Sequence, residues 1–301
     1  MSKPRSCPVC NTPSEGASLF LEENIDHARL SGFSFASRKE PEYMCHHLVR
    51  CTECDLVYAS CPPMQDELAN AYHVAEYDTS DEADDAASAY MCAIQPILVR
   101  LPQRRSALEI GTGNGIFLEK LASVGFSNLV GVEPSSAAIA TAPERRRTWI
   151  RNGIFREADF ARGTFDLICC FMTMEHVADP GEIARSALRL LRPGGAFVTV
   201  THDYRSLINR LLGKKSPIID IEHLQLFSMK SISELFSRSG YSDIKVRTFS
   251  NTYPIRYWVR LAPVPSVIKR IINSTLAGLG ADHLKSTFNV GNILTTGFRK
   301  D

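Results

Sequence analysis

One short turn constrains the fold of this chain more than any other feature. Residues 107–117 read ALEIGTGNGIF, so that Gly111, Gly113 and Gly115 stand between two apolar runs. Glycine permits tight turns and lets the backbone approach a ligand closely. The pattern predicts a buried strand, a turn and a helix, the unit that binds ligands at the carboxyl ends of strands in α/β sheets.

The residues after Arg105 repeat this unit, because short apolar runs alternate with amphipathic segments. We expect strands at residues 106–111, 129–134, 165–172, 195–201 and 292–300, and helices at residues 115–125, 135–147 and 181–191. This order predicts an α/β protein with a Rossmann-like, doubly wound sheet.

Two cofactors compete for the glycine turn. The dinucleotide pattern G-x-G-x-x-G needs a glycine at position 116, where this chain has Ile116, and its third glycine is Gly115. Glu109 stands two residues before the first glycine. The resulting E-x-G-x-G-x-G resembles the first motif of the class I S-adenosylmethionine-dependent methyltransferases. The resemblance implies S-adenosylmethionine as the cofactor and the seven-stranded methyltransferase sheet as the fold.

Later motifs of that family follow in order, and the resemblance runs from about Ser106 to the end of the chain. Glu133 in GVEPS has the position of the acid that accepts both ribose hydroxyls. Gly153 and Ile154 match the adenine position, and Phe171 belongs to the following motif, FDLICCFMTMEHVADP. The resemblance implies a cofactor site made of Glu109, Gly111, Gly113, Gly115, Glu133, Gly153, Ile154 and Phe171.

Methyl transfer to a hydroxyl also needs a base that removes the proton. The same resemblance places His176 in MEHVADP close to the expected methyl position. The alternative for His176 is a structural role, in which it bonds to the backbone at the start of a helix. Some relatives bind a divalent metal through E-x-x-E-H at this point. Met172 replaces the first glutamate here, so a catalytic metal is not expected.

A second polar group, Asp220, Glu222 and His223, precedes a helix predicted between Ser228 and Gly240. We expect its loop to cover the acceptor side of the cleft. Similar methyltransferases with a zinc-ribbon module, from bacterial sugar and cell-surface glycan pathways, carry a histidine here. His223 is therefore the leading candidate for the base, with His176 and Glu222 as further catalytic candidates. A role in ordering the loop is the alternative for His223.

Two C-x-x-C pairs, CPVC and CTEC, stand in the first sixty residues. Their cysteines are Cys7, Cys10, Cys51 and Cys54. Four thiolates form the tetrahedral set of a structural zinc site, although the 40 residues between the pairs exceed the usual gap. Nearby residues that could replace one ligand are Cys45, His46, His47 and Cys61. A closed site leaves no position for water, so we expect it to support folding; ordinary reduced cysteines are the alternative.

These patterns divide the chain into three parts. We expect a zinc-ribbon-like module at residues 1–65, a helical connector at 66–104, and a methyltransferase domain at 105–301 with a lid insertion at about 203–280. Residues 253–272 interleave aromatic and basic residues with apolar ones. We interpret this segment as a helical lid or a dimer contact, with peripheral membrane contact as the alternative.

Charge and composition limit the partners and the location. The chain has 34 basic and 33 acidic residues, so no net field attracts nucleic acid. It has no apolar stretch long enough to span a membrane, and no apolar run follows its N-terminal basic residues. Nine cysteines without an export signal indicate a reducing cytoplasm.

The sequence therefore predicts an S-adenosylmethionine-dependent methyltransferase that acts on a small molecule or a glycan. A sugar hydroxyl is the leading acceptor, and a lipid-linked acceptor or carbon methylation of a keto-sugar are variants. The alternatives are a zinc-containing RNA methyltransferase and a non-catalytic cofactor-binding scaffold. RNA is disfavoured because the chain shows no basic stripe and has an acidic run at Asp78–Asp85. The oligomeric state stays open.

Overall fold

The computed structural model describes residues 4–31, 34–35, 41–75, 81–262, 264–281 and 283–300. The first part of the acidic run at Asp78–Asp85 lies outside the described residues. The strands are β1 (Ala17–Leu21), β2 (Leu48–Cys51), β3 (Val57–Ala59), β4 (Ser106–Ile110), β5 (Asn128–Glu133), β6 (Ile150–Asn152), β7 (Phe165–Phe171), β8 (Leu191–His202), β9 (Gln225–Leu226), β10 (Ser242–Pro254) and β11 (Lys285–Phe298). The α-helices are α1 (Gln65–Val74), α2 (Asp81–Arg100), α3 (Ile116–Ser123), α4 (Ser136–Ala140), α5 (Glu144–Arg147), α6 (Pro180–Leu190), α7 (Leu207–Leu212), α8 (Met229–Ser239), α9 (Ile255–Leu261) and α10 (Ser266–Gly278).

The larger sheet has the strand order β10-β11-β8-β7-β4-β5-β6. Strands β6, β5, β4, β7 and β8 are parallel, whereas β11 is antiparallel to both of its neighbours, β8 and β10. The predicted α/β class and the seven-stranded Rossmann-like sheet are confirmed. The sheet is mixed rather than wholly parallel, because the chain returns from β10 and inserts β11 between β10 and β8.

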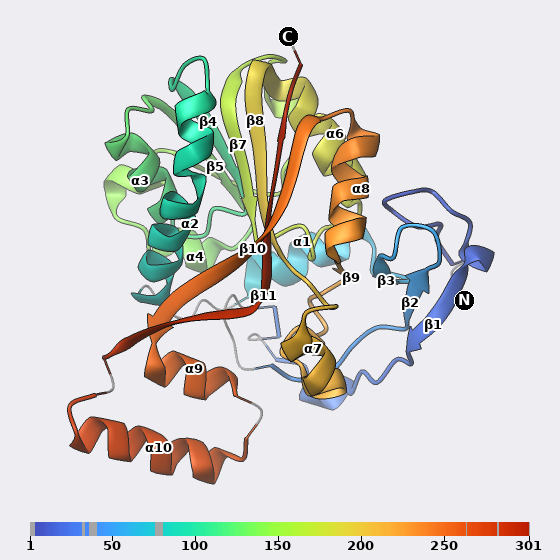
Figure 1. Cartoon of the computed structure of the whole chain (residues 1–301), viewed down its shortest axis with the longest axis vertical. Helices are drawn as coiled ribbons and strands as arrows, with labels where there is room; N and C mark the ends of the chain where they lie inside the picture. Colours follow the sequence, from blue (N-terminus) through green and yellow to red (C-terminus); the bar gives the residue numbers. More distant parts are fainter. Residues whose placement is uncertain are drawn as a thin grey trace.

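Alternate residues of the central strands face two separate cores. Leu108 and Ile168 pack into the core that includes residues of α6 and α8, whereas Ala107 and Leu167 pack into the core that includes residues of α2 and α3. Figure 1 shows α2 and α3 on one side of the sheet and α6 and α8 on the other. Because helices cover both faces, β7 is buried along its whole length.

Local signals explain where the helices begin and end. The prediction for α8 is confirmed: the Ser228 side chain accepts a hydrogen bond from the Ser231 N–H at the start, and Gly240, with φ of 96°, follows the end. Residues 135–147, predicted as one helix, instead form α4 and α5. Pro143 separates them, because proline has no N–H for a helix interior and stands at the start of α5.

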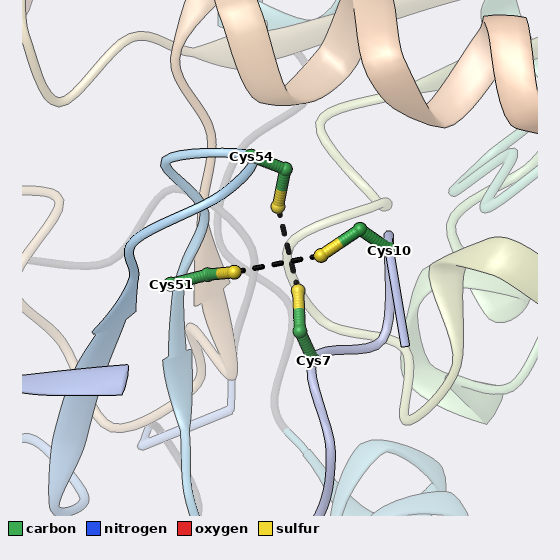
Figure 2. A group of neighbouring side chains, drawn as sticks. All are labelled: Cys7, Cys10, Cys51 and Cys54. Carbon is green, nitrogen blue, oxygen red and sulfur yellow. Dashed lines mark hydrogen bonds between the residues drawn. The ribbon is translucent and has the colours of Figure 1, made fainter. Parts of the chain in front are cut away.

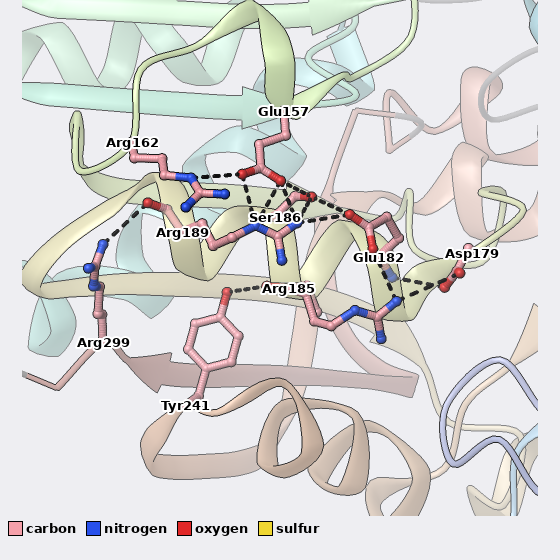
Figure 3. A network of polar contacts seen from close by, with 10 residues as sticks. Glu157, Arg162, Asp179, Glu182, Arg185, Ser186, Arg189, Tyr241 and Arg299 are labelled. Carbon is pink, nitrogen blue, oxygen red and sulfur yellow. Dashed lines mark hydrogen bonds and ion pairs between the residues drawn. The ribbon is translucent and has the colours of Figure 1, made fainter.

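A network of ion pairs covers the outer side of α6 (Figure 3). Arg189 contacts the carboxylates of Glu157 and Glu182, and Arg185 pairs with Glu182 and Asp179. The hydrogen bond from Arg189 lowers the pKa of Glu157 to about 2. Pairs as exposed as these contribute about 0–1 kcal/mol each, so their main effect is to hold these side chains in place along α6.

A smaller sheet has the order β1-β2-β3-β9 and combines distant parts of the chain. Its first three strands come from the N-terminal region, and β9 comes from the segment just before α8 (Figure 1). Strands β3 and β9 are antiparallel, with Val57 opposite Leu226 and Tyr58 opposite Gln225. The N-terminal region and the segment after His223 therefore share one sheet.

The region between β10 and β11 forms an arm that carries α9 and α10 (Figure 1). The two strands extend into this arm, where residues 251–254 pair with residues 285–288. Tyr253 at its base contacts Tyr257 and Trp258 of α9 through ring centroid distances of 4.5 and 5.2 Å. Within the described part of the chain, no helix has the length and apolar character needed to cross a membrane.

Candidate active site

A cavity of about 510 Å³ opens at the carboxyl ends of β4, β5 and β7. The predicted cofactor residues that line it are Glu109, Gly111, Gly113, Glu133, Gly153, Ile154 and Phe171. The predicted catalytic residues His176, Glu222 and His223 line the same cavity. Gly115 does not belong to the cavity lining, and a Cβ atom on it would face Ile150 and Arg146.

Gly111 lets the turn after β4 lie directly against the next loop. Its φ is 77°, and a Cβ atom added to it would lie 2.2 Å from the Thr173 hydroxyl oxygen. A larger residue would therefore be strained by its backbone and would collide with Thr173. Gly115 has φ of 72° at the start of α3, so its part in the turn is to permit the backbone conformation.

Two backbone N–H groups hold the Glu133 carboxylate at the end of β5. Oε2 accepts a hydrogen bond from Gly113 at 2.7 Å, and Oε1 accepts one from Ser135 at 2.9 Å. Burial raises the pKa of Glu133, although these two hydrogen bonds act in the opposite direction. Each carboxylate oxygen can accept further hydrogen bonds, so the group can receive two neighbouring hydroxyls of a ribose.

The charge of the cavity fits S-adenosylmethionine, which carries a sulfonium and an ammonium group. Carboxylates at its wall belong to Glu109, Glu133, Asp179, Glu182 and Glu222. Among the described residues of this lining, none is lysine or arginine. Glu109 is buried and accepts a hydrogen bond from the Thr112 hydroxyl, which fixes its carboxylate at the end of β4. Asp179 and Glu182 form ion pairs with Arg185 and Arg189, so the negative field of the wall comes mainly from Glu109, Glu133 and Glu222. This field favours a cationic ligand.

The three predicted catalytic groups lie close together at the wall of the cavity. His176 Nδ1 lies 3.1 Å from the Glu222 carbonyl oxygen and 3.8 Å from Glu222 Oε2. The ring centroids of His176 and His223 are 4.8 Å apart. One donor atom from each of the three groups lies within 4.8 Å of the others, a spacing that could also hold a metal ion.

A carbonyl group orients the ring of His223. His223 Nδ1 lies 2.8 Å from the Ile218 carbonyl oxygen, and the side chain is 7% exposed. A carbonyl oxygen only accepts hydrogen bonds, so Nδ1 carries the proton and Nε2 is the basic nitrogen. This tautomer is the one that a general base acting through Nε2 requires.

Two polar residues near the predicted histidines, Tyr72 and His202, were not predicted from the sequence. The Tyr72 hydroxyl, from α1, lies 3.0 Å from His176 Nδ1. His202 ends β8, its ring centroid lies 5.7 Å from that of His223, and burial lowers its pKa to about 4. His202 directly follows a predicted strand, and this signal could have identified it. Tyr72 has no comparable signal, because it comes from the connector.

The four predicted metal-binding cysteines form one cluster, with their sulfur atoms pointing toward one another (Figure 2). The Sγ–Sγ distances are 3.4 Å for Cys7 and Cys54 and 3.4 Å for Cys10 and Cys51, and all four thiols are free. Sulfur atoms bound to tetrahedral zinc at ~2.3 Å lie ~3.8 Å apart. The cluster therefore fits a tetrahedral metal ion with little movement.

Arg5 connects the cysteine cluster to the rest of the protein. It stands two residues before Cys7, and its guanidinium donates to the carbonyl oxygens of Ala59 at 2.9 Å and Ala178 at 2.5 Å and to the Gln225 side chain at 3.3 Å. Burial lowers the pKa of Arg5 to about 10, so the group is charged at neutral pH. One side chain thus bridges β3, the loop after β7 and β9.

Gln225 continues this connection to the histidines. Its amide nitrogen donates to the carbonyl oxygens of Met174 at 2.6 Å and Val177 at 2.7 Å, on either side of His176. Gln225 itself stands two residues after His223. Arg5, which precedes the cysteine cluster, is therefore connected through Gln225 to the two loops that carry His176 and His223.

The sheet order, the glycine turn and the acidic cavity define a class I S-adenosylmethionine-dependent methyltransferase. Residues 82–246 match the family model described as a methyltransferase domain. This match spans more than half of the 301 residues, and the chain belongs to this methyltransferase family.

Relatives in the curated proteins are named ubiquinone biosynthesis O-methyltransferase. The one from Methylococcus capsulatus is 31% identical over 117 residues, which is 36% of this chain and 49% of the relative. The one from Shewanella pealeana is 28% identical over 155 residues, which is 45% of this chain and 65% of the relative. The chain thus spans about half to two thirds of the length of these relatives.

Two of the solved structures to which this chain is similar are methyltransferases. A methyltransferase from Thermotoga maritima, described as a possible histamine N-methyltransferase, is 20% identical with a TM-score of 0.47 and covers 72% of this chain and 92% of its own. The phosphoethanolamine N-methyltransferase 2 of Haemonchus contortus, in complex with S-adenosyl-L-methionine, is 15% identical with a TM-score of 0.45 and covers 81% of this chain and 62% of its own.

Proposed function

We propose that this protein transfers a methyl group from S-adenosylmethionine to a hydroxyl oxygen of a neutral small molecule. The observation that carries this proposal is the orientation of His223, whose Nδ1–H donates to the Ile218 carbonyl and whose Nε2 is basic. His223 would accept the hydroxyl proton at Nε2 as the oxygen attacks. The name O-methyltransferase, which the curated relatives carry, supports transfer to oxygen.

The cofactor side of the proposal assigns a task to each predicted residue. S-adenosylmethionine, when bound, supplies a methyl group on a positively charged sulfur. Glu133 would accept the ribose hydroxyls, Gly153 and Ile154 would border the adenine, and Glu109 and Phe171 would complete the wall near the positive groups. Gly111 and Gly113 would let the backbone approach the cofactor, and Gly115 would shape the turn.

His176 and Glu222 would support His223 on the acceptor side. The contacts of His176 with the Glu222 carbonyl and with the Tyr72 hydroxyl fix its ring beside that of His223. His176 and Glu222 then shape the space in which the acceptor oxygen must lie in line with the methyl group.

The absence of cations in the described lining supports a neutral acceptor. A phosphate or a carboxylate would meet several carboxylates in the cavity and no lysine or arginine from the described residues. A sugar ring satisfies this condition, and Tyr253, Tyr257 and Trp258 line the cavity as flat apolar surfaces against which a ring can pack. A glycan or a lipid-linked acceptor would have to place any charged portion outside the cavity.

We also propose that the cluster of Cys7, Cys10, Cys51 and Cys54 binds a structural zinc ion. Four thiolates leave no open position for water, so the ion would stabilise the N-terminal region and take no part in methyl transfer. On this proposal residues 1–65 are a zinc-ribbon-like module, residues 66–104 a connector, and residues 105–301 the methyltransferase domain with a lid at about 203–280.

The function is tested by transfer of labelled methyl from S-adenosylmethionine into a host extract. The extract is separated into RNA, glycan or lipid, and small-molecule fractions, with the Glu109→Gln variant as the blank. Label in an alkali-stable ether of a neutral small molecule or glycan is the expected result. Label in RNA would overturn the small-molecule acceptor, and methyl attached to nitrogen or carbon would overturn O-methylation.

Replacement of Glu133 with glutamine is expected to weaken S-adenosylmethionine binding by about 10-fold to 100-fold, because each lost charge-assisted hydrogen bond is worth about 1.5–3 kcal/mol. The wild type should also lose affinity on acidification, because burial raises the pKa of Glu133 and protonation removes an acceptor. Titration calorimetry at several pH values measures both effects. An unchanged affinity of the variant would remove Glu133 from the cofactor site.

Replacement of Arg5 with alanine is expected to lower kcat/KM for the acceptor while the S-adenosylmethionine affinity stays constant. The change leaves the Ala59 and Ala178 carbonyl groups without their donor, at a cost of about 1–3 kcal/mol each when such groups are buried. Arg29→Ala removes an exposed arginine of the same region and is the matched control. An equal loss in kcat/KM for the acceptor and in S-adenosylmethionine affinity would indicate general destabilisation.

A further inference from the structure

Each of two asparagines in the cavity has one buried amide atom to which no described residue forms a hydrogen bond. Asn251 of β10 is 3% exposed, and Asn292 of β11 is 1% exposed. Neither Asn251 Oδ1 nor Asn292 Nδ2 has a hydrogen-bond partner among the residues that the structure describes. Both residues line the cavity. Buried polar atoms are rarely left unpaired, so this pair indicates a group that arrives with the ligand.

The position of Asn292 is fixed by its neighbours in the sheet. It lies opposite His202 of β8, and its Oδ1 accepts a hydrogen bond of 2.8 Å from His202 Nδ1. This bond occupies the amide oxygen, which leaves Nδ2 as the donor for a ligand. On its other side Asn292 lies opposite Phe249, and Asn251 follows two residues later on the same strand. The register of the two strands breaks between Phe249 and Asn251, and Asn251 lies opposite Phe288. The two asparagines therefore belong to neighbouring strands and are offset along them.

We propose that Asn251 and Asn292 form a subsite for a second hydroxyl group of the acceptor, separate from the hydroxyl that is methylated. A hydroxyl offers one donor and two acceptor positions. It can donate to Asn251 Oδ1 and accept from Asn292 Nδ2, which satisfies both buried atoms at once. A ligand with no polar group at this place would leave them unpaired, and the site would reject it.

The subsite lies beside the proposed base. The ring of His202 bridges the two, because it contacts Asn292 on one side and lies 5.7 Å from the ring of His223 on the other. Both hydroxyls thus belong to one small molecule, a diol or polyol. Burial lowers the pKa of His202 to about 4, so this part of the wall is uncharged at neutral pH and suits a neutral group.

This inference rests on the proposed function, and binding measurements test it separately from methyl transfer. The probes are two pairs of neutral compounds that differ by one hydroxyl: catechol and phenol, and methyl rhamnopyranoside and a monodeoxy analogue. Their dissociation constants are measured with S-adenosylhomocysteine bound. In the wild type we expect the member with the extra hydroxyl to bind about tenfold more tightly in at least one pair. In Asn251→Leu and Asn292→Leu this preference should fall to about twofold or less.

Two controls separate recognition from folding. Asn251→Asp retains an acceptor at Oδ1 and should keep most of the preference, and Thr248→Val, exposed on β10 outside the cavity, should keep all of it. Affinity for S-adenosylhomocysteine and the melting temperature monitor each variant. No preference in the wild type for either pair, or an equal preference in the leucine variants, would overturn the subsite. Loss of methyl transfer to oxygen with the preference intact would overturn only the proposed function.

Discussion

Replacement of His223 with glutamine is expected to lower kcat by about 10²-fold to 10⁴-fold, the usual contribution of a general base. Glutamine has a similar size, and its amide can still donate a hydrogen bond toward the Ile218 carbonyl, which in the wild type accepts from His223 Nδ1 at 2.8 Å. It cannot accept a proton from the acceptor hydroxyl. The measurement is kcat at saturating S-adenosylmethionine, together with the dissociation constant of S-adenosylhomocysteine, which should stay within about twofold because His223 belongs to the acceptor side.

His73→Gln is the matched control, because His73 is an exposed histidine outside the cavity lining. Its kcat should equal that of the wild type. Retention of full kcat in His223→Gln would show that His223 only orders its loop. If the wild-type activity required added magnesium and His223→Gln no longer responded to it, His176, Glu222 and His223 would instead form a metal site. Their donor atoms lie within 4.8 Å of one another.

Replacement of Cys54 with serine is expected to abolish stoichiometric zinc and to lower the melting temperature by about 10 °C or more. Structural zinc contributes on the order of 10 kcal/mol to the folding of small zinc domains, and even a third of that shifts the melting temperature of a domain this large by about 10 °C. Zinc per chain, determined by atomic emission on protein purified without chelators, and thermal unfolding are the two measurements.

Cys92→Ser provides the comparison, because Cys92 is an exposed thiol on α2 far from the cluster in sequence. It should retain zinc and melt as the wild type does. Wild-type protein with no bound metal would remove the zinc proposal. Bound metal that survives in Cys54→Ser would mean that another residue, such as Cys45 or His46, supplies the fourth ligand.

The elements that depend on consecutive residues could be predicted from the sequence. The E-x-G-x-G-x-G turn and the alternating apolar runs indicate β4, α3 and β5 because strand, turn and helix are consecutive there. The cap at Ser228 is likewise local. The break at Pro143 was predictable in principle, because proline interrupts a helix wherever it stands inside one.

The missing parts of the site depend on contacts between distant residues. Strand β9 has two residues, too few for any periodicity, and it exists only because β3 pairs with it. Tyr72 enters the cavity through the packing of α1, and Asn251 and Asn292 stand on adjacent strands only through the pairing of β10 with β11. No single segment of the sequence contains these relationships, so pattern reasoning could not find them.

The pairing of β3 with β9 has a consequence for the growing polypeptide. Val57 of β3 pairs with Leu226 of β9. At a synthesis rate of about 5–20 residues per second, the edge of β3 would stay unpaired for roughly 10–30 s until β9 is synthesised. An open strand edge invites pairing with other chains during that time. Expression of the N-terminal region with β1, β2 and β3 but without β9 should therefore yield aggregates. Exchange of this region between homologues should give folded protein only when residues 225–226 are exchanged together with it.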